Sequence, residues 1–148
     1  MFTTEDYLIN QPDTVSAVCA GLSLYNRARG RGWTKRLWAT VTGRNRELRR
    51  LSEKASRAQR LAGIRTVSIC NIVGSEDRSG DFDRDFNPLR DATRDRWLSV
   101  YRAWVNGVAL PPVELVRGPD GYYVRDGHHR LSVARALGQD YVEAVVIE

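Results

Sequence analysis

Hydrophobic residues recur at helical spacing through the first 63 residues of the chain. One helix is predicted to run from Asp13 into the Arg-Gly-Arg-Gly sequence at 29–32, where the two glycines should end it. A short second helix is expected at 34–42, and a third at 45–63 with Gly63 as its stop. The first part of the chain is therefore predicted to be helical throughout.

After Gly63 the pattern changes to strands alternating with helices. The predicted order is strand 66–73, helix from Thr93, strands 113–117 and 122–125, helix 127–137 and strand 141–147. In the helix that begins at Thr93, four residues are expected to face inward, namely Trp97, Val100, Tyr101 and Trp104. The pattern predicts an α/β (α+β) domain at 64–148, with a β-α-β-β-α-β core, behind a helical extension at 1–63.

The extension is strongly basic, which changes the picture of its partners. Residues 27–60 contain twelve Arg or Lys against Glu47 and Glu53, whereas the whole 148-residue chain has a net charge of only +5. Such a segment suggests an anionic partner, and nucleic acid is the first expectation. The residues expected to bind it are Lys35, Arg36, Arg44, Arg46, Arg49, Arg50, Lys54 and Arg57.

A membrane surface is the second expectation for the same segment. Trp33, Leu37 and Trp38 lie among the basic residues, as in a helix that rests on an anionic bilayer, although the apolar stretch is short. No stretch approaches the roughly 20 apolar residues of a membrane span, and no signal peptide is evident, so a cytoplasmic location is expected. Cys19 and Cys70 show no metal-site spacing and are expected to be buried thiols.

The chain has only two histidines, and they stand together where a predicted strand becomes a predicted helix, in GYYVRDGHHRLSVARALG at 121–138. The first backbone N–H groups of a helix attract anions, and Gly127 lets a ligand approach them closely. Arg130 can grip phosphate oxygens, and His128 and His129 can each donate a hydrogen bond. Asp126 can cap the helix or hold Mg²⁺. These residues predict a phosphate site.

Residues 64–148, and above all the run LPPVELVRGPDGYYVRDGHHRLSVARALGQDYVEAVVIE, resemble the ParB/sulfiredoxin-like superfamily, which shares a Gly-x-x-Arg phosphate motif at the start of a helix. The resemblance implies Mg²⁺-dependent binding of a nucleotide, CTP or ATP/ADP, with slow hydrolysis as a further expectation. It also implies that Arg78 or Arg84 reaches over the phosphates. Sulfiredoxin chemistry is not expected, because His128 stands where those enzymes have their catalytic cysteine.

Other branches of the superfamily suggest alternatives. Free serine kinases have a similar Asp-Gly-His-(His or Thr)-Arg motif and a catalytic glutamate after the first strand, which implies a small-molecule kinase with Glu76 and Asp126 as catalytic residues. A nuclease would use Mg²⁺ with Asp81, Asp83 and Asp85 of the loop at 77–88. A domain that only binds a partner protein is a third alternative.

Partition proteins of the ParB type read DNA through parts downstream of this domain. Because the sequence ends at Glu148, ten residues after Gly138, those DNA-reading and dimer-forming parts are expected to be missing. DNA contact is therefore expected from the basic helices. A homodimer remains an open alternative.

Overall fold

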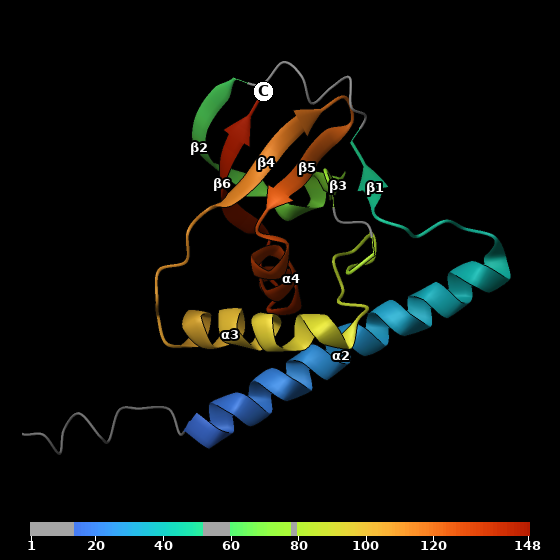
Figure 1. Ribbon diagram of the computed structural model, residues 1–148, viewed down its shortest axis with the longest axis vertical. Coiled ribbons are helices and arrows are strands. Elements are labelled where there is room, and N and C mark those ends of the chain that lie inside the picture. The colour runs from blue at the N-terminus through green and yellow to red at the C-terminus, as the bar shows by residue number, and fades with distance from the viewer. Residues whose placement is uncertain (1–13, 52–59, 78–79) are drawn as a thin grey trace, which may run out of the picture.

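The computed structural model describes residues 14–51, 60–77 and 80–148 (Figure 1). A long helix, α2 (Thr14–Thr42), begins the described chain, and two shorter helices follow, α3 (Arg94–Val105) and α4 (His128–Ala136). The strands are β1 (Arg49–Arg50), β2 (Leu61–Ser68), β3 (Ile72–Ser75), β4 (Val113–Gly118), β5 (Gly121–Asp126) and β6 (Tyr141–Ile147). Short 3₁₀ turns occupy Ile69–Asn71 and Asp91–Thr93.

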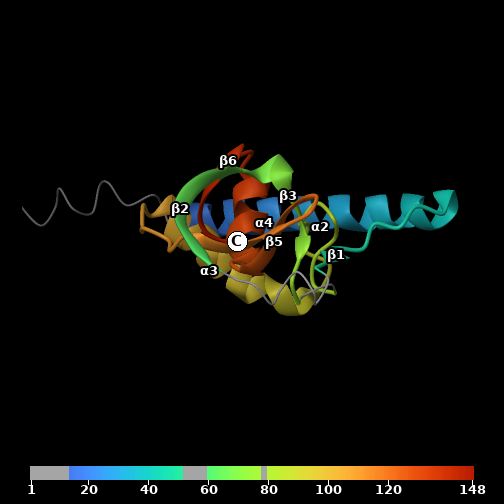
Figure 2. The same ribbon diagram turned by 90° about the horizontal axis from the view of Figure 1, so that it is seen from above.

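The six strands form one mixed sheet in the order β1-β3-β5-β4-β6-β2. β3 runs parallel to both β1 and β5, whereas β4 and β5 form an antiparallel hairpin. The sheet curves around α4, as Figure 2 shows from above. Leu131 and Ala134 of α4 pack there against buried residues of β4, β5 and β6, which form the main hydrophobic core. The fold is thus α/β, with a long N-terminal helix and two helices interspersed among the strands.

The helix α2 is continuous, so the predicted break at 29–32 is wrong. A glycine inside a helix costs only about 1 kcal/mol relative to alanine. Tertiary contacts on both sides of the two glycines offset this cost, because Tyr25, Ala28 and Ala39 are all buried.

Small residues let α2 pack closely against α3. A Cβ atom on Gly21 would lie 2.7 Å from the ring of Tyr101, so only glycine allows this approach. The ring of Tyr25 meets that of Trp97 edge-on, with the centroids 5.4 Å apart. Trp97 in turn donates a hydrogen bond of 2.9 Å from Nε1 to Ser132 Oγ of α4. The three helices therefore share a second core beside the sheet.

The predicted helix at 45–63 is also wrong in its described parts. Arg49–Arg50 form strand β1, and Gly63 lies inside β2, which pairs antiparallel with β6. The register shifts between Leu61 and Gly63, and this irregularity accommodates the positive φ of Gly63. Pairing with strands distant in sequence overrides the local helical pattern here. Residues 52–59 lie outside the described part of the chain.

The remaining predicted elements appear in the predicted order, with one division. The expected strand at 66–73 is split by a 3₁₀ turn into β2 and β3, which lie at different places in the sheet.

The two cysteines are exposed, which corrects the expectation that they are buried. Among the described residues, none of the helices is both long enough and apolar enough to span a bilayer.

The continuity of α2 can be tested at Gly30, which is exposed and where an added Cβ atom would meet no other atom within 4 Å. Gly30→Ala should raise the free energy of unfolding by about 0.5–1 kcal/mol, because alanine loses less backbone entropy in a helix. Urea unfolding followed by circular dichroism measures the change.

Gly43 provides the matched control, since it has equally open surroundings but a φ of +65° just after the helix. Gly43→Ala should lower the free energy of unfolding by about 1 kcal/mol. If Gly30→Ala also destabilises the protein, the helix does not continue through 29–32.

Candidate functional site

The predicted phosphate motif lies where α4 begins, beside the ends of two parallel strands. β5 ends at Asp126 and leads directly through Gly127 into α4, while the neighbouring parallel strand β3 ends at Ser75. The carboxyl ends of adjacent parallel strands are where open α/β sheets commonly bind ligands. The site therefore consists of the start of α4, the end of β3 and the loop that follows β3.

Gly127 precedes α4 in a left-handed conformation, with φ 97° and ψ 22°. A Cβ atom at this position would lie 2.7 Å from Cγ1 of Val113 and 3.1 Å from a guanidinium nitrogen of Arg130. Backbone conformation and packing against β4 therefore both require glycine. The tight fit also brings the guanidinium of Arg130 close to the first turn of the helix.

His128 is a buried residue that connects α4 to β3. Its side chain is only 5% exposed, and its Nε2 lies 2.6 Å from Ser75 Oγ in a buried hydrogen bond. Its ring stacks on that of Phe82, with centroids 6.1 Å apart. His129, which is partly exposed, meets the same phenyl ring edge-on at 5.2 Å. His128 thus holds the helix start in place, while His129 lies nearer the surface.

Arg130 is held by three acceptors around the start of α4. Its Nη1 donates to the carbonyl oxygens of Pro111, at 2.5 Å, and Pro112, at 2.8 Å. Its Nη2 donates to Asp126 Oδ2 at 2.6 Å. The arginine side chain is 15% exposed and the aspartate side chain 65% exposed. The guanidinium therefore has a fixed position, and its carboxylate partner faces solvent.

Glu76 follows β3 and pairs with Arg125 of β5. Its two carboxylate oxygens accept hydrogen bonds from Arg125 Nε at 2.6 Å and Nη2 at 3.0 Å. This hydrogen-bonded pairing raises the pKa of the Arg125 guanidinium further above its usual range, against the opposing effect of burial. The pair joins the ends of β3 and β5. Arg78, expected to reach over the phosphates, lies outside the described residues.

The loop at 80–90 is a compact structure of its own. Asp83 is buried, and its Oδ1 accepts hydrogen bonds from the backbone N–H groups of Asp85 and Asn87. Phe82 and Phe86 are almost completely buried and anchor the loop to the body of the domain. Among the described residues, no three His, Cys, Asp or Glu side chains gather as a possible metal ligand set.

Asp85 connects this loop to the basic segment. Its Oδ2 accepts hydrogen bonds from Lys35 Nζ at 2.8 Å and Arg46 Nη2 at 2.6 Å. Burial alone would raise the pKa of Asp85, but the Lys35 hydrogen bond and the charges of Lys35, Arg46 and Arg135 outweigh burial. They hold the pKa below its ordinary value of 3.8.

The residues expected to bind nucleic acid therefore have different surroundings. Lys35 and Arg46 pair with Asp85, and Arg49 pairs with Asp120. Three further residues have exposed side chains, namely Arg36, Arg44 and Arg50. Lys54 and Arg57 lie outside the described residues. Acidic groups of the sheet domain thus neutralise part of the positive charge that the sequence concentrates in this segment.

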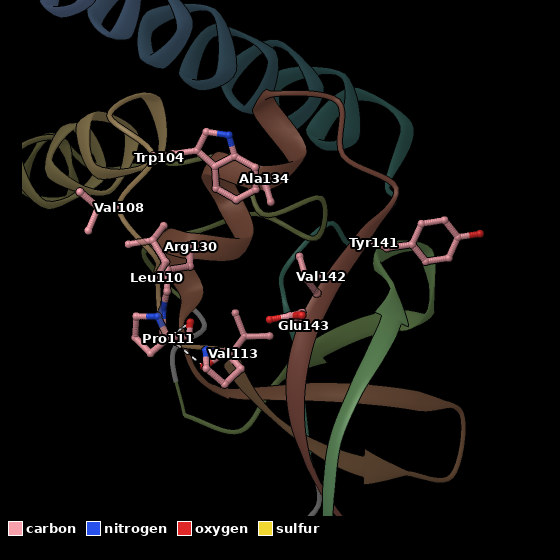
Figure 3. A pocket seen from close by; sticks show the side chains of 12 residues that line it. Trp104, Val108, Leu110, Pro111, Val113, Arg130, Ala134, Tyr141, Val142 and Glu143 are labelled. Carbon is pink, nitrogen blue, oxygen red and sulfur yellow. Dashed lines mark hydrogen bonds between the residues drawn. The ribbon is translucent and has the colours of Figure 1, made fainter. Parts of the chain in front are cut away.

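An apolar groove of about 390 Å³ beside Arg130 was not predicted from the sequence (Figure 3). Trp104 of α3, Leu110 and Pro111 of the following loop, and Tyr141 of β6 line it. Trp104 is 41% exposed, which corrects the expectation that it faces inward. Spacing alone could not reveal the groove, because its walls come from segments that lie far apart in the sequence. Ser75, the partner of His128, likewise had no local signal.

The buried Ser75–His128 contact should contribute measurably to stability. Ser75→Ala is expected to lower the free energy of unfolding by about 1–3 kcal/mol, because a buried polar group of His128 loses a partner. Chemical unfolding measures the loss. Ser99→Ala, at an exposed position of α3, is the matched control and should change stability by less than about 0.5 kcal/mol. Equal effects of the two substitutions would contradict the structural role of Ser75.

The Asp85 ion pairs should make stability depend on pH in the acidic range. Folding lowers the pKa of this carboxylate, so its ionised form stabilises the folded state at pH values above the unfolded pKa, which is near 3.8. The stabilisation is lost as the pH falls through the lower pKa of the folded state. Asp85→Asn should therefore be less stable than wild type at neutral pH, and the difference should shrink below about pH 4. Urea unfolding at several pH values gives the comparison.

Asp95→Asn is the control, because the Asp95 side chain is almost fully exposed. Its difference from wild type should stay small at every pH. A difference between Asp85→Asn and wild type that does not change between neutral and acidic pH would contradict the assignment.

No protein-family model matches the chain, and no curated protein matches it at a significant level. The interpretation of the site therefore depends on its own geometry and on the motif in its sequence.

Proposed function

We propose that this protein binds the phosphate groups of a nucleotide at the start of α4, as a ParB/sulfiredoxin-like domain. The observation that carries the proposal is the convergence of three features at the carboxyl ends of β3 and β5. These are the first turn of α4, the fixed guanidinium of Arg130 and the exposed carboxylate of Asp126. Together they suit a metal-bound phosphate.

The first turn of α4 favours a negative charge. The helix's own hydrogen bonds begin with the Leu131 N–H, which donates to the Gly127 carbonyl, so the preceding N–H groups lie outside that ladder. The first turn contains no acidic residue. Partial positive charge from the helix dipole and the full charge of Arg130 therefore act on the same small region.

Arg130 and Asp126 can divide the work of binding. The two proline carbonyls hold the guanidinium of Arg130 in place independently of Asp126. An ion pair with an exposed carboxylate contributes little stability, so a phosphate can compete for this guanidinium. Asp126 can then hold Mg²⁺, which usually binds one or two protein carboxylates together with substrate phosphates. Mg²⁺ would neutralise phosphate charge at this position.

The groove beside Arg130 suits the less polar part of the same ligand. Its volume of about 390 Å³ falls within the usual range for small-molecule sites, and Trp104 offers an aromatic face to a base. Arg130 lines the groove while also contacting Asp126, so base and phosphate can be bound on either side of one guanidinium. CTP, ATP and ADP all have the required combination of base and phosphates.

The alternatives gain no specific support from the described residues. A kinase would use Glu76 as a base, yet both of its carboxylate oxygens accept hydrogen bonds from Arg125. A nuclease would use the loop aspartates, yet Asp83 accepts a hydrogen bond from the backbone N–H of Asn87, and Asp85 pairs with Lys35. Nucleic-acid binding by the basic segment gains no support either, since Lys35, Arg46 and Arg49 pair with carboxylates of the same chain.

Thermal unfolding with a panel of CTP, ATP, GTP, ADP and sulfate, with and without Mg²⁺, tests the proposal. A nucleotide at about 100 times its dissociation constant should stabilise the protein by about 2.7 kcal/mol and raise Tm by about 5–10 °C. The shift should require Mg²⁺ and should disappear in Arg130→Ala, because the charged group at the helix start is lost.

Arg135→Ala is the matched control, because this arginine lies in the last turn of the same helix. This variant should keep the nucleotide-induced shift relative to its own ligand-free Tm. Absence of a shift with every nucleotide at millimolar concentration, or an unchanged shift in Arg130→Ala, would reject the site.

A further inference from the structure

The C-terminal half of α2 exposes four large apolar side chains. The exposed fractions are 63% for Trp33, 59% for Leu37, 71% for Trp38 and 79% for Val41. We call these four residues the outer α2 face. Such a cluster, exposed within ten residues of one helix, is unusual for a face that meets only water.

The outer α2 face lies opposite the side of the helix that packs on the body. An α-helix turns by about 100° per residue, which places the four side chains on one side of α2. The buried positions occupy the other side, and they are Gly21, Tyr25, Ala28, Gly32 and Ala39. Figures 1 and 2 both show this half of α2 projecting past α3. The outer α2 face is therefore accessible over its full length.

The charged residues of α2 itself all have one sign. Helix α2 contains five Arg or Lys and no Asp or Glu. On the helical projection, Arg27 and Arg31 border one edge of the outer α2 face, and Arg36 lies beyond the other edge. All three have exposed side chains, and Arg44 follows the helix end. The combination is an apolar strip between cationic borders.

We propose that the outer α2 face docks on the surface of an anionic lipid bilayer, with α2 lying in the plane of the interface. Trp33 and Trp38 suit the headgroup level, where tryptophan is enriched. Leu37 and Val41 reach the acyl boundary, and the arginines contact lipid phosphates through side chains long enough to stay in the polar layer. The helix does not cross the bilayer, consistent with its composition.

The charge pattern favours a lipid surface over other partners. A second copy of the same face would bring the arginines of two helices together without carboxylates from either helix to offset them. A single-stranded nucleic acid would supply phosphates and bases for the tryptophans, but Leu37 and Val41 gain nothing from base stacking. Of these three partners, the bilayer surface alone uses both the aliphatic and the cationic side chains.

Co-sedimentation of the full chain with vesicles tests this proposal independently of nucleotide binding. Vesicles of phosphatidylcholine alone are compared with vesicles of phosphatidylcholine and phosphatidylglycerol in equal parts, at low and high salt. The test variant carries Leu37→Ser and Trp38→Ser. The matched control carries Leu61→Ser and Ile64→Ser, which are similarly exposed at 68% and 69% but lie on β2. A charge variant carries Arg31→Gln and Arg36→Gln.

The wild type and the β2 variant should bind the anionic vesicles, weakly at high salt, and should bind neutral vesicles at least about tenfold less well. The Leu37/Trp38 variant should bind about tenfold or more weakly, because serine lacks the favourable free energy that a large apolar side chain gains on transfer from water to the bilayer. The charge variant should be weakened on anionic vesicles only. Circular dichroism should confirm that the substituted chains keep their helix content.

Three results would overturn the proposal. The first is equal vesicle binding by wild type and the Leu37/Trp38 variant. The second is binding of single-stranded DNA or RNA, but of no vesicle, that the charge variant loses. The third is a wild-type dimer in light scattering that becomes monomeric in the Leu37/Trp38 variant without any vesicle binding. Nucleotide-induced shifts in Tm are measured separately and do not depend on any of these results.

Discussion

The buried hydrogen bond between His128 and Ser75 joins the first turn of α4 to the end of β3, and the candidate site is arranged around it. Phe82 packs on both histidine rings, so the loop after β3 is held against the same turn. Gly127 lets β5 enter α4 against Val113 at a separation that no other residue permits. The anion-attracting end of the helix is consequently a rigid part of the core, and a ligand would find it already formed.

Charge is distributed so that structure and candidate binding use different groups. Asp85 fastens the loop to Lys35 and Arg46, and Glu76 fastens the ends of two strands through Arg125. These pairs neutralise cations that would otherwise count toward an anionic partner. In our two proposals, lipid phosphates contact the exposed arginines along α2, and nucleotide phosphates contact the guanidinium at the start of α4. The two proposed sites share no residue.

Much of the domain after Gly63 could be predicted from sequence because its signals are local. The Gly-Pro-Asp-Gly turn joins two strands whose pairing it also sets, and the helix that opens at Gly127 is flanked by clear strand patterns. The helical extension was harder to predict. Gly30 suggests a helix stop, whereas long-range packing continues α2 past 29–32. The alanine-rich segment at 55–62 suggests a helix, whereas Leu61–Ser68 pairs with β6.

Neighbouring residues were enough to predict most elements at 64–148 and the helix start at Gly127, because turns, caps and strand periodicity are local properties. They did not reveal that the strand expected at 66–73 divides into β2 and β3. Which motif residues face a ligand depended instead on the folded chain. His128 is drawn into the core by Ser75, 53 positions away, Arg130 is fixed by the carbonyls of Pro111 and Pro112, and the adjoining groove has walls from α3, α4 and β6. Such contacts between distant segments arise from packing and burial, and spacing along the chain carries no record of them.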